Sequence, residues 1–131
     1  MRLSNKWGRA LGLAVMLFWG AAVQAQLIQI TPAEADLEAV ETRLNRLYSD
    51  RDYKADLPEK TARLKADIAT VTRLIDTRQF SGTMLTAAYL IRAEAQGLLN
   101  GLYRAANKPT DLELARQTLA DYDRVIAAGQ D

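Results

Sequence analysis

Three aspartates between residues 50 and 56 suggest a metal site, because Asp50, Asp52 and Asp56 alternate with other residues as ligands in a calcium loop do. The rest of that motif is missing. Lys54 stands where a third ligand is needed, Ala55 where the loop needs glycine, and Thr61 where a bidentate glutamate closes the site. The segment is therefore predicted to be a solvated loop between helices, with no metal.

Groups that commonly catalyse reactions are scarce. The chain has no histidine and no cysteine, so it lacks imidazole bases, thiolate nucleophiles and disulfides. Asp121 and Asp123 are two residues apart on a predicted helix, which points them in different directions and predicts that both are exposed. We predict no catalytic residue and no cofactor, and hence a protein that is not an enzyme.

A polar stripe that occurs twice is the strongest candidate for a binding surface. Its members are spaced four residues apart on predicted helices, as Glu41, Asn45 and Ser49, and again as Arg92, Gln96 and Asn100. The ring of Tyr89 or Tyr103 is expected beside Arg92, and planar guanidinium groups next to aromatic rings are frequent at interfaces. Two alternatives stay open for the stripe, an ordinary solvated face and, for Arg92, a structural salt bridge with Glu38 or Glu41.

The first 25 residues have the pattern of a secretory signal peptide. Basic residues at 2, 6 and 9 precede an apolar run over 10–23, and Val23 and Ala25 supply the small residues that a signal peptidase requires. A helix over that run would be roughly 21 Å long, short of the ~30 Å hydrocarbon core of a bilayer. We predict cleavage and export to the periplasm or the exterior, without a stable membrane span afterwards. An uncleaved anchor is the alternative, because Trp7 and Trp19 flank the run.

Cleavage would also change the charge balance. Residues 1–25 hold three of the 17 basic residues and none of the 16 acidic ones, so residues 26–131 carry a net charge of −2. Nucleic-acid binding needs a basic face, which this balance does not offer. The remaining length suits a single domain.

Apolar residues recur with helical spacing in four stretches, which predicts an all-α domain with helices at about 32–50, 57–79, 82–100 and 111–128. The prolines stand at or just before helix starts, and Asn100-Gly101 is a plausible helix end. The third helix is apolar nearly all round and is expected to be central. The expected core stripes are Leu37, Val40, Leu44, Leu47 and Tyr48, then Leu64, Ile68, Val71 and Ile75, and finally Leu112, Ala115, Leu119, Tyr122 and Ile126.

The two halves of this domain repeat each other. A shift of 51 residues aligns Leu47 with Leu98 and Pro58 with Pro109 without a gap, so the proline before the second helix is preserved. The same shift aligns Ile68 with Leu119, and both are expected to be buried. We read the domain as two helical hairpins.

The last hairpin resembles a tetratricopeptide repeat. The resemblance rests on the run from Thr118 to Ala127, with Ala120, Tyr122 and Arg124 where the family places small, aromatic and basic residues, and on Tyr89 with Ala93 in the preceding helix. Ala93 and Thr118 are farther apart than in the family, which implies a stretched unit with longer helices or a longer loop over 101–110. The resemblance implies a right-handed stack whose first helices line a concave groove, and it would place the polar stripe there.

Together these features predict an exported helical-repeat module that binds a protein or peptide partner, with tentative partner-binding residues Glu41, Asn45, Arg92, Gln96, Asn100 and Tyr103. Two repeats are few for a stack, which usually needs three or more, so self-association or docking onto a larger periplasmic assembly is a natural completion. The alternative is a closed four-helix bundle that carries a small ligand or serves in a stress response. An enclosed pocket lined by Tyr48, Tyr89 and Tyr122 would favour the bundle.

Overall fold

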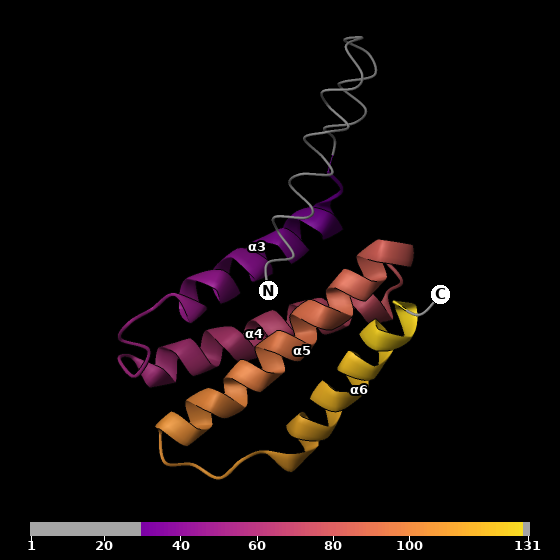
Figure 1. The fold of residues 1–131 in the computed structure, drawn as a ribbon. Coiled ribbons are helices and arrows are strands. Elements are labelled where there is room, and N and C mark those ends of the chain that lie inside the picture. The colour runs from indigo at the N-terminus through magenta and orange to yellow at the C-terminus, as the bar shows by residue number, and fades with distance from the viewer. Residues whose placement is uncertain (1–29, 130–131) are drawn as a thin grey trace.

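The computed structural model describes residues 30–129, which form four α-helices: α3 (Pro32–Tyr48), α4 (Leu57–Asp76), α5 (Gly82–Ala105) and α6 (Leu112–Ala128). They make two antiparallel hairpins joined by short loops, and the second hairpin lies beside the first (Figure 1). The all-α prediction is confirmed. The signal peptide predicted for residues 1–25 lies outside the described residues.

Two of the four helices begin at residues whose side chains cap the first turn. The hydroxyl of Thr31 accepts a hydrogen bond of 3.1 Å from the backbone N–H of Glu34, and Pro32 occupies the first turn of α3. At α6 the cap is Asp111, whose carboxylate accepts from the N–H of Leu114 at 3.0 Å. None of these four helices is long and apolar enough to cross a membrane.

The third helix continues past the end predicted at Asn100-Gly101. It reaches Ala105, because Leu102 lies one residue beyond the glycine and is almost completely buried in the core. Burying a leucine contributes roughly 1.5–3 kcal/mol, which outweighs the cost of about 1 kcal/mol for glycine inside a helix. The first and second helices end slightly earlier than predicted, at Tyr48 and Asp76.

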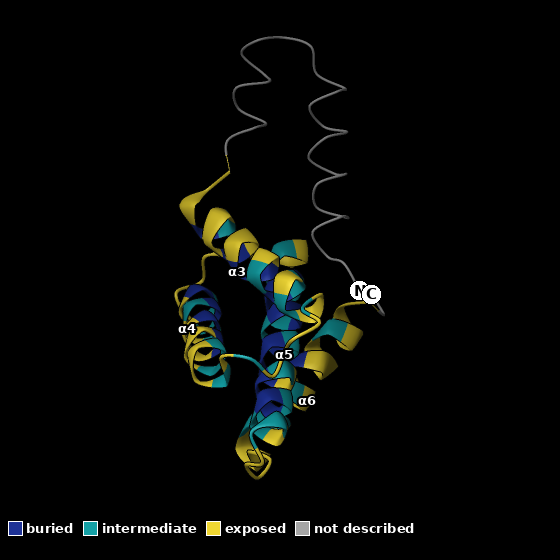
Figure 2. Cartoon of the chain, turned by 90° about the vertical axis from the view of Figure 1, so that its left-hand side faces the viewer, coloured by how far each residue is buried: buried dark blue, intermediate teal, exposed yellow. Residues whose placement is uncertain are grey.

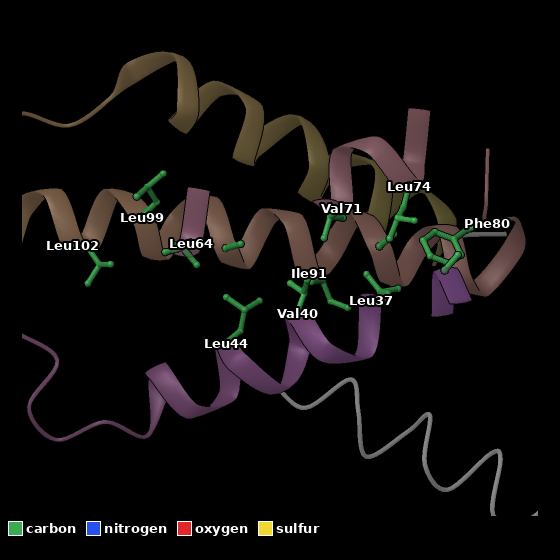
Figure 3. Close-up of a cluster of buried hydrophobic side chains, with 13 residues drawn as sticks. Leu37, Val40, Leu44, Leu64, Val71, Leu74, Phe80, Ile91, Leu99 and Leu102 are labelled. Carbon is green, nitrogen blue, oxygen red and sulfur yellow. The ribbon is translucent and has the colours of Figure 1, made fainter. Parts of the chain in front are cut away.

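The core is built where α3, α4 and α5 meet (Figure 3). From α3, Leu37, Val40 and Leu44 point toward Ile91 of α5 (Figure 3). Phe80, in the loop between the hairpins, covers one end of this cluster. The remaining buried apolar members are Ala33, Leu64, Val71, Leu74, Ala88, Ala95, Leu99 and Leu102.

Helix α5 is the central element. It contacts α3, α4 and α6, and its buried residues are distributed around most of its circumference. Figure 2 shows this buried helix with α4 on one side and α6 on the other. The predicted central position of the third helix is confirmed, and it is the arrangement that the two-hairpin reading requires.

The predicted buried stripe of α6 is wrong by one residue in helical phase. Leu119 is 65% exposed, and Leu112, Tyr122 and Ile126 are exposed as well. The face turned toward α5 instead carries Leu114, Thr118, Asp121 and Val125, of which Asp121 is only 2% exposed. A buried ion pair at Asp121 sets this phase, and the prediction that Asp121 is exposed is therefore also wrong.

The turns within the two hairpins share an unusual backbone conformation. Asp56, before α4, has φ 54°, and Asn107, before α6, has φ 59°. These two positions are 51 residues apart and each stands two residues before a proline. Left-handed residues other than glycine are uncommon, so their occurrence in register extends the internal repeat from sequence to backbone geometry.

Candidate partner-binding surface

Arg92 and Gln96 of α5 converge on Asp121 of α6. The guanidinium of Arg92 donates two hydrogen bonds of 2.7 Å to the two carboxylate oxygens, and the amide of Gln96 adds a third of 3.0 Å. Arg92 also donates to the hydroxyl of Thr72 on α4 at 3.3 Å. One buried carboxylate thus ties three helices together, and the bidentate geometry is the strong form of the pair.

Aromatic stacking completes this cluster on its outer side. The guanidinium carbons of Arg92 and Arg124 lie 5.5 Å and 4.8 Å from the ring centre of Tyr89, within cation–π range. The pKa of Arg92 is raised, chiefly by the hydrogen bonds to Asp121 and against the opposing effect of burial. Arg92 is therefore a structural cation. Its partner is Asp121, not the Glu38 or Glu41 considered from the sequence.

The side chain of Asn100, two turns beyond Arg92 on α5, is also hydrogen-bonded within the chain. Its side-chain amide donates to the carbonyl of Asp111 at 3.0 Å, and its side-chain carbonyl accepts from the N–H of Asp111 at 2.8 Å. This reciprocal pair fixes the residue that caps α6. Longer helices or a longer loop were expected over 101–110, and the helix is what is extended: residues 101–105 continue α5, and the loop begins only after Ala105.

The predicted residues on α3 are also largely covered. Glu41 is buried and Asn45 is half-buried. Between them in the sequence, Arg43 pairs with the buried Asp67 of α4, with atoms 2.6 Å apart, and that pair holds the first hairpin together. The sequence reasoning missed this pair.

Tyr103, the last predicted binding residue, is half-buried near the end of α5, and the ammonium of Lys65 lies 5.8 Å from its ring centre. The structure thus brings Arg92 and Gln96 together around Asp121, and it uses their polar atoms inside the chain. Partner binding through the six residues proposed from the sequence stays a prediction. The accessible cleft of the structure is lined by other residues.

An open cleft of about 540 Å³ lies between the end of α3, the loop to α4 and the end of α5. Two aromatic rings border it, Tyr48 at 57% and Tyr53 at 46% exposed. Its other lining residues are Leu47, Asp50, Lys54, Leu98, Gly101, Leu102, Arg104, Ala105 and Asn107. Exposed aromatic rings beside aliphatic groups are typical of protein-binding sites.

The charges of this cleft are unbalanced. Asp50 is paired with Lys60, whose ammonium is 2.9 Å from the carboxylate, and this hydrogen bond lowers the pKa of Asp50. Lys54 and Arg104 have no acidic partner among residues 30–129. The ammonium of Lys54 lies 5.9 Å from the ring centre of Tyr53, so the cleft offers an acidic ligand two cations that have no acidic partner.

Glu94 of α5 interacts electrostatically with the rings of Tyr48 on α3 and Tyr122 on α6. Burial raises the pKa of Glu94, and burial together with the charge of Glu94 raises the pKa values of Tyr48 and Tyr122. Tyr48 and Tyr122 are both exposed and Tyr89 stacks between arginines. These three rings therefore do not line one enclosed pocket.

No group of three or more His, Cys, Asp or Glu residues within 30–129 could hold a metal ion. No protein-family model, curated protein or solved structure matches the chain.

Proposed function

We propose that this protein is a non-enzymatic, exported helical-repeat module that binds a peptide segment of a partner in the cleft at the end of α3 and α5. The proposal rests above all on that cleft, which combines exposed rings, aliphatic side chains and two cations that have no acidic partner. The preferred segment carries an aliphatic or aromatic side chain next to an acidic one.

Three features support binding as opposed to chemistry. The chain has no histidine or cysteine, and the buried polar side chains around Arg92 and Asn100 are satisfied within the fold. A tetratricopeptide-like stack, the proposed architecture, commonly serves as a scaffold for peptide segments.

Export is proposed on the pattern of residues 1–25, and the binding role does not depend on it. A small-ligand carrier of the closed-bundle type is less well supported. Such a carrier encloses its ligand between four helices, whereas here Tyr48 is more than half exposed and α5 takes up the centre.

Gly101 gives a direct test, because it lines the cleft and an added Cβ would meet nothing within 4 Å. Gly101→Leu should keep the fold, since leucine favours helix over glycine by up to about 1 kcal/mol, and should fill the cleft. The matched control is Gly97→Leu, one turn earlier on the same helix, where an added Cβ also meets nothing and no cleft is lined.

The probe is a displayed library of short random peptides, selected on the wild type and measured by fluorescence anisotropy. Selected peptides should combine an apolar residue with an acidic one. They should bind Gly101→Leu at least about tenfold more weakly, lose affinity for Arg104→Glu, and bind Gly97→Leu normally. Peptides that bind Gly101→Leu as well as the wild type would disprove the cleft as the binding site.

A further inference from the structure

The exposed apolar face of α6 is unexplained by the proposed cleft. Leu112, Ala115, Leu119, Tyr122 and Ile126 follow one another at alternating spacings of three and four residues. That spacing is the seam of a two-stranded coiled coil, here about 21 Å long at 1.5 Å per residue. We define these five residues as the α6 seam, and four of them are exposed large apolar side chains.

The internal repeat shows what such a seam does when it is covered. The equivalent residues of α4, at a shift of 51, are Leu64, Ile68, Val71 and Ile75. Leu64 and Val71 are buried in the core, and Ile68 and Ile75 pack against it, because α5 lies on that face. Within residues 30–129 no helix takes the corresponding place beside α6. The α6 seam therefore has the composition of a helix–helix contact without its second helix.

We infer that a second copy of this chain supplies that helix, with the two α6 helices packed antiparallel about a two-fold axis. The other end of the stack does not fit the seam, since the exposed face of α3 is polar and includes Asp36, Glu38, Thr42 and Arg46. The same seam on a second copy is an apolar surface that complements the α6 seam, and this pairing gives a closed, isologous dimer.

Charges along the free edge of the seam agree with an antiparallel pairing. Arg116 and Asp123 lie on that edge two turns apart, and both are exposed. When two such helices run in opposite directions, each Arg116 faces the Asp123 of the other copy, so the opposite charges attract across the free edge. Arg116 now pairs with Glu113 at 2.8 Å, and an exposed pair of this kind exchanges partners at little cost.

The experiment is sedimentation velocity on the protein recovered from expression of the full chain, over a wide concentration range. The seam is short, so we expect a reversible dimer with a dissociation constant on the order of 10 μM. Leu119→Lys should weaken the dimer on the order of a hundredfold, because each dimer would bury two unpaired ammonium groups. Gln117→Lys, exposed on α6 away from the seam, should leave association unchanged.

A charge exchange tests the orientation. Arg116→Asp alone and Asp123→Arg alone should each weaken the dimer by about three- to tenfold, and the double variant should restore it. A wild type that stays monomeric at the highest concentration would overturn the inference. In that case Leu119→Cys introduces a single thiol into a chain that has none. A slow reaction of this thiol with a maleimide would show that another segment or another protein covers the seam. Failure of the double variant to restore association would overturn the antiparallel arrangement, and none of these outcomes bears on the peptide cleft.

Discussion

Arg92 of α5 binds Asp121 of α6 through two hydrogen bonds of 2.7 Å, and the aspartate side chain is almost wholly removed from water. A buried ion pair of this quality contributes less to net stability than its geometry suggests, since both charges are desolvated. It does fix how α6 is rotated against α5. Together with the hydrogen bonds between Asn100 and Asp111, this pair therefore holds the last helix in its orientation against α5.

Removing one member of this pair should be costly. Asp121→Ala leaves the guanidinium of Arg92 buried without its carboxylate and should lower the free energy of unfolding by about 3–5 kcal/mol. Urea unfolding followed by circular dichroism measures the loss. Asp123→Ala, two residues away and exposed, should stay within about 0.5 kcal/mol of the wild type. The double variant Arg92→Met with Asp121→Leu should recover much of the loss, and a double variant as unstable as Asp121→Ala would contradict this account.

A comparison of two leucines, one in the core and one in the α6 seam, tests the placement of α6. Leu102 is 2% exposed and Leu119 is 65% exposed. Leu102→Ala should cost about 2–5 kcal/mol through lost burial and a residual cavity, whereas Leu119→Ala in the monomer should cost less than about 1 kcal/mol. Thermal unfolding at a concentration below that of dimerisation gives both values. Equal losses would mean that α6 is rotated differently from the structure described above.

The contrast between Leu119 and Asp121 also shows what the sequence could predict and what it could not. The start of α3 at Pro32 and the stripe from Leu37 to Leu44 were identified correctly, because helix starts and periodicity are local properties. On α6 the apolar residues were assigned to the core, as periodicity alone requires. A buried carboxylate with a guanidinium from another helix is a tertiary feature, and no local pattern marks it.

The same distinction applies to the candidate site. The polar stripe on the third helix was recognised, yet the internal partners of Arg92 and Asn100 lie 29 and 11 residues further along the chain. The cleft was missed altogether. It forms where Tyr53, in a loop, meets the last turns of a helix that was predicted to stop at Gly101.

Asn100 should be a sensitive position for the second hairpin. Asn100→Ala removes both hydrogen bonds to the backbone of Asp111 and leaves that N–H and C=O to find other partners, at a cost of about 1–3 kcal/mol. Native-state hydrogen exchange should show the first turn of α6 opening more readily. Gln117→Ala on the exposed side of α6 is the control. Unchanged protection at the start of α6 in Asn100→Ala would show that the clamp contributes little.

The dependence of stability on pH should carry a signature of Glu94. Burial raises the pKa of Glu94 in the folded chain, so the folded chain binds this proton more tightly than the unfolded chain does. The stability that this tighter proton binding gives the folded state is present at low pH and is lost as the pH rises through the raised folded-state pKa. Glu94→Gln should therefore be more stable than the wild type at neutral pH, by less than about 1 kcal/mol because the group is half-exposed.

The measurement is the melting temperature of both proteins between pH 4 and pH 8. The gap between Glu94→Gln and the wild type should widen with rising pH and level off near neutrality. A gap that is constant across this range would assign the effect of the substitution to packing and would exclude a raised pKa. Glu38→Gln, on the exposed side of α3, should show neither effect.

The position of α5 also bears on how the chain reaches its native state. The principal contacts of α5 are made with the helices that precede and follow it, through loops of a few residues, and only the contact with α3 spans a longer stretch. Chains with mostly local contacts fold in microseconds to milliseconds. Among the main helix–helix contacts, only the one between α3 and α4 does not involve α5. Substitutions that weaken α5 should therefore slow folding, whereas substitutions on the outer faces of α3 and α6 should mainly speed unfolding.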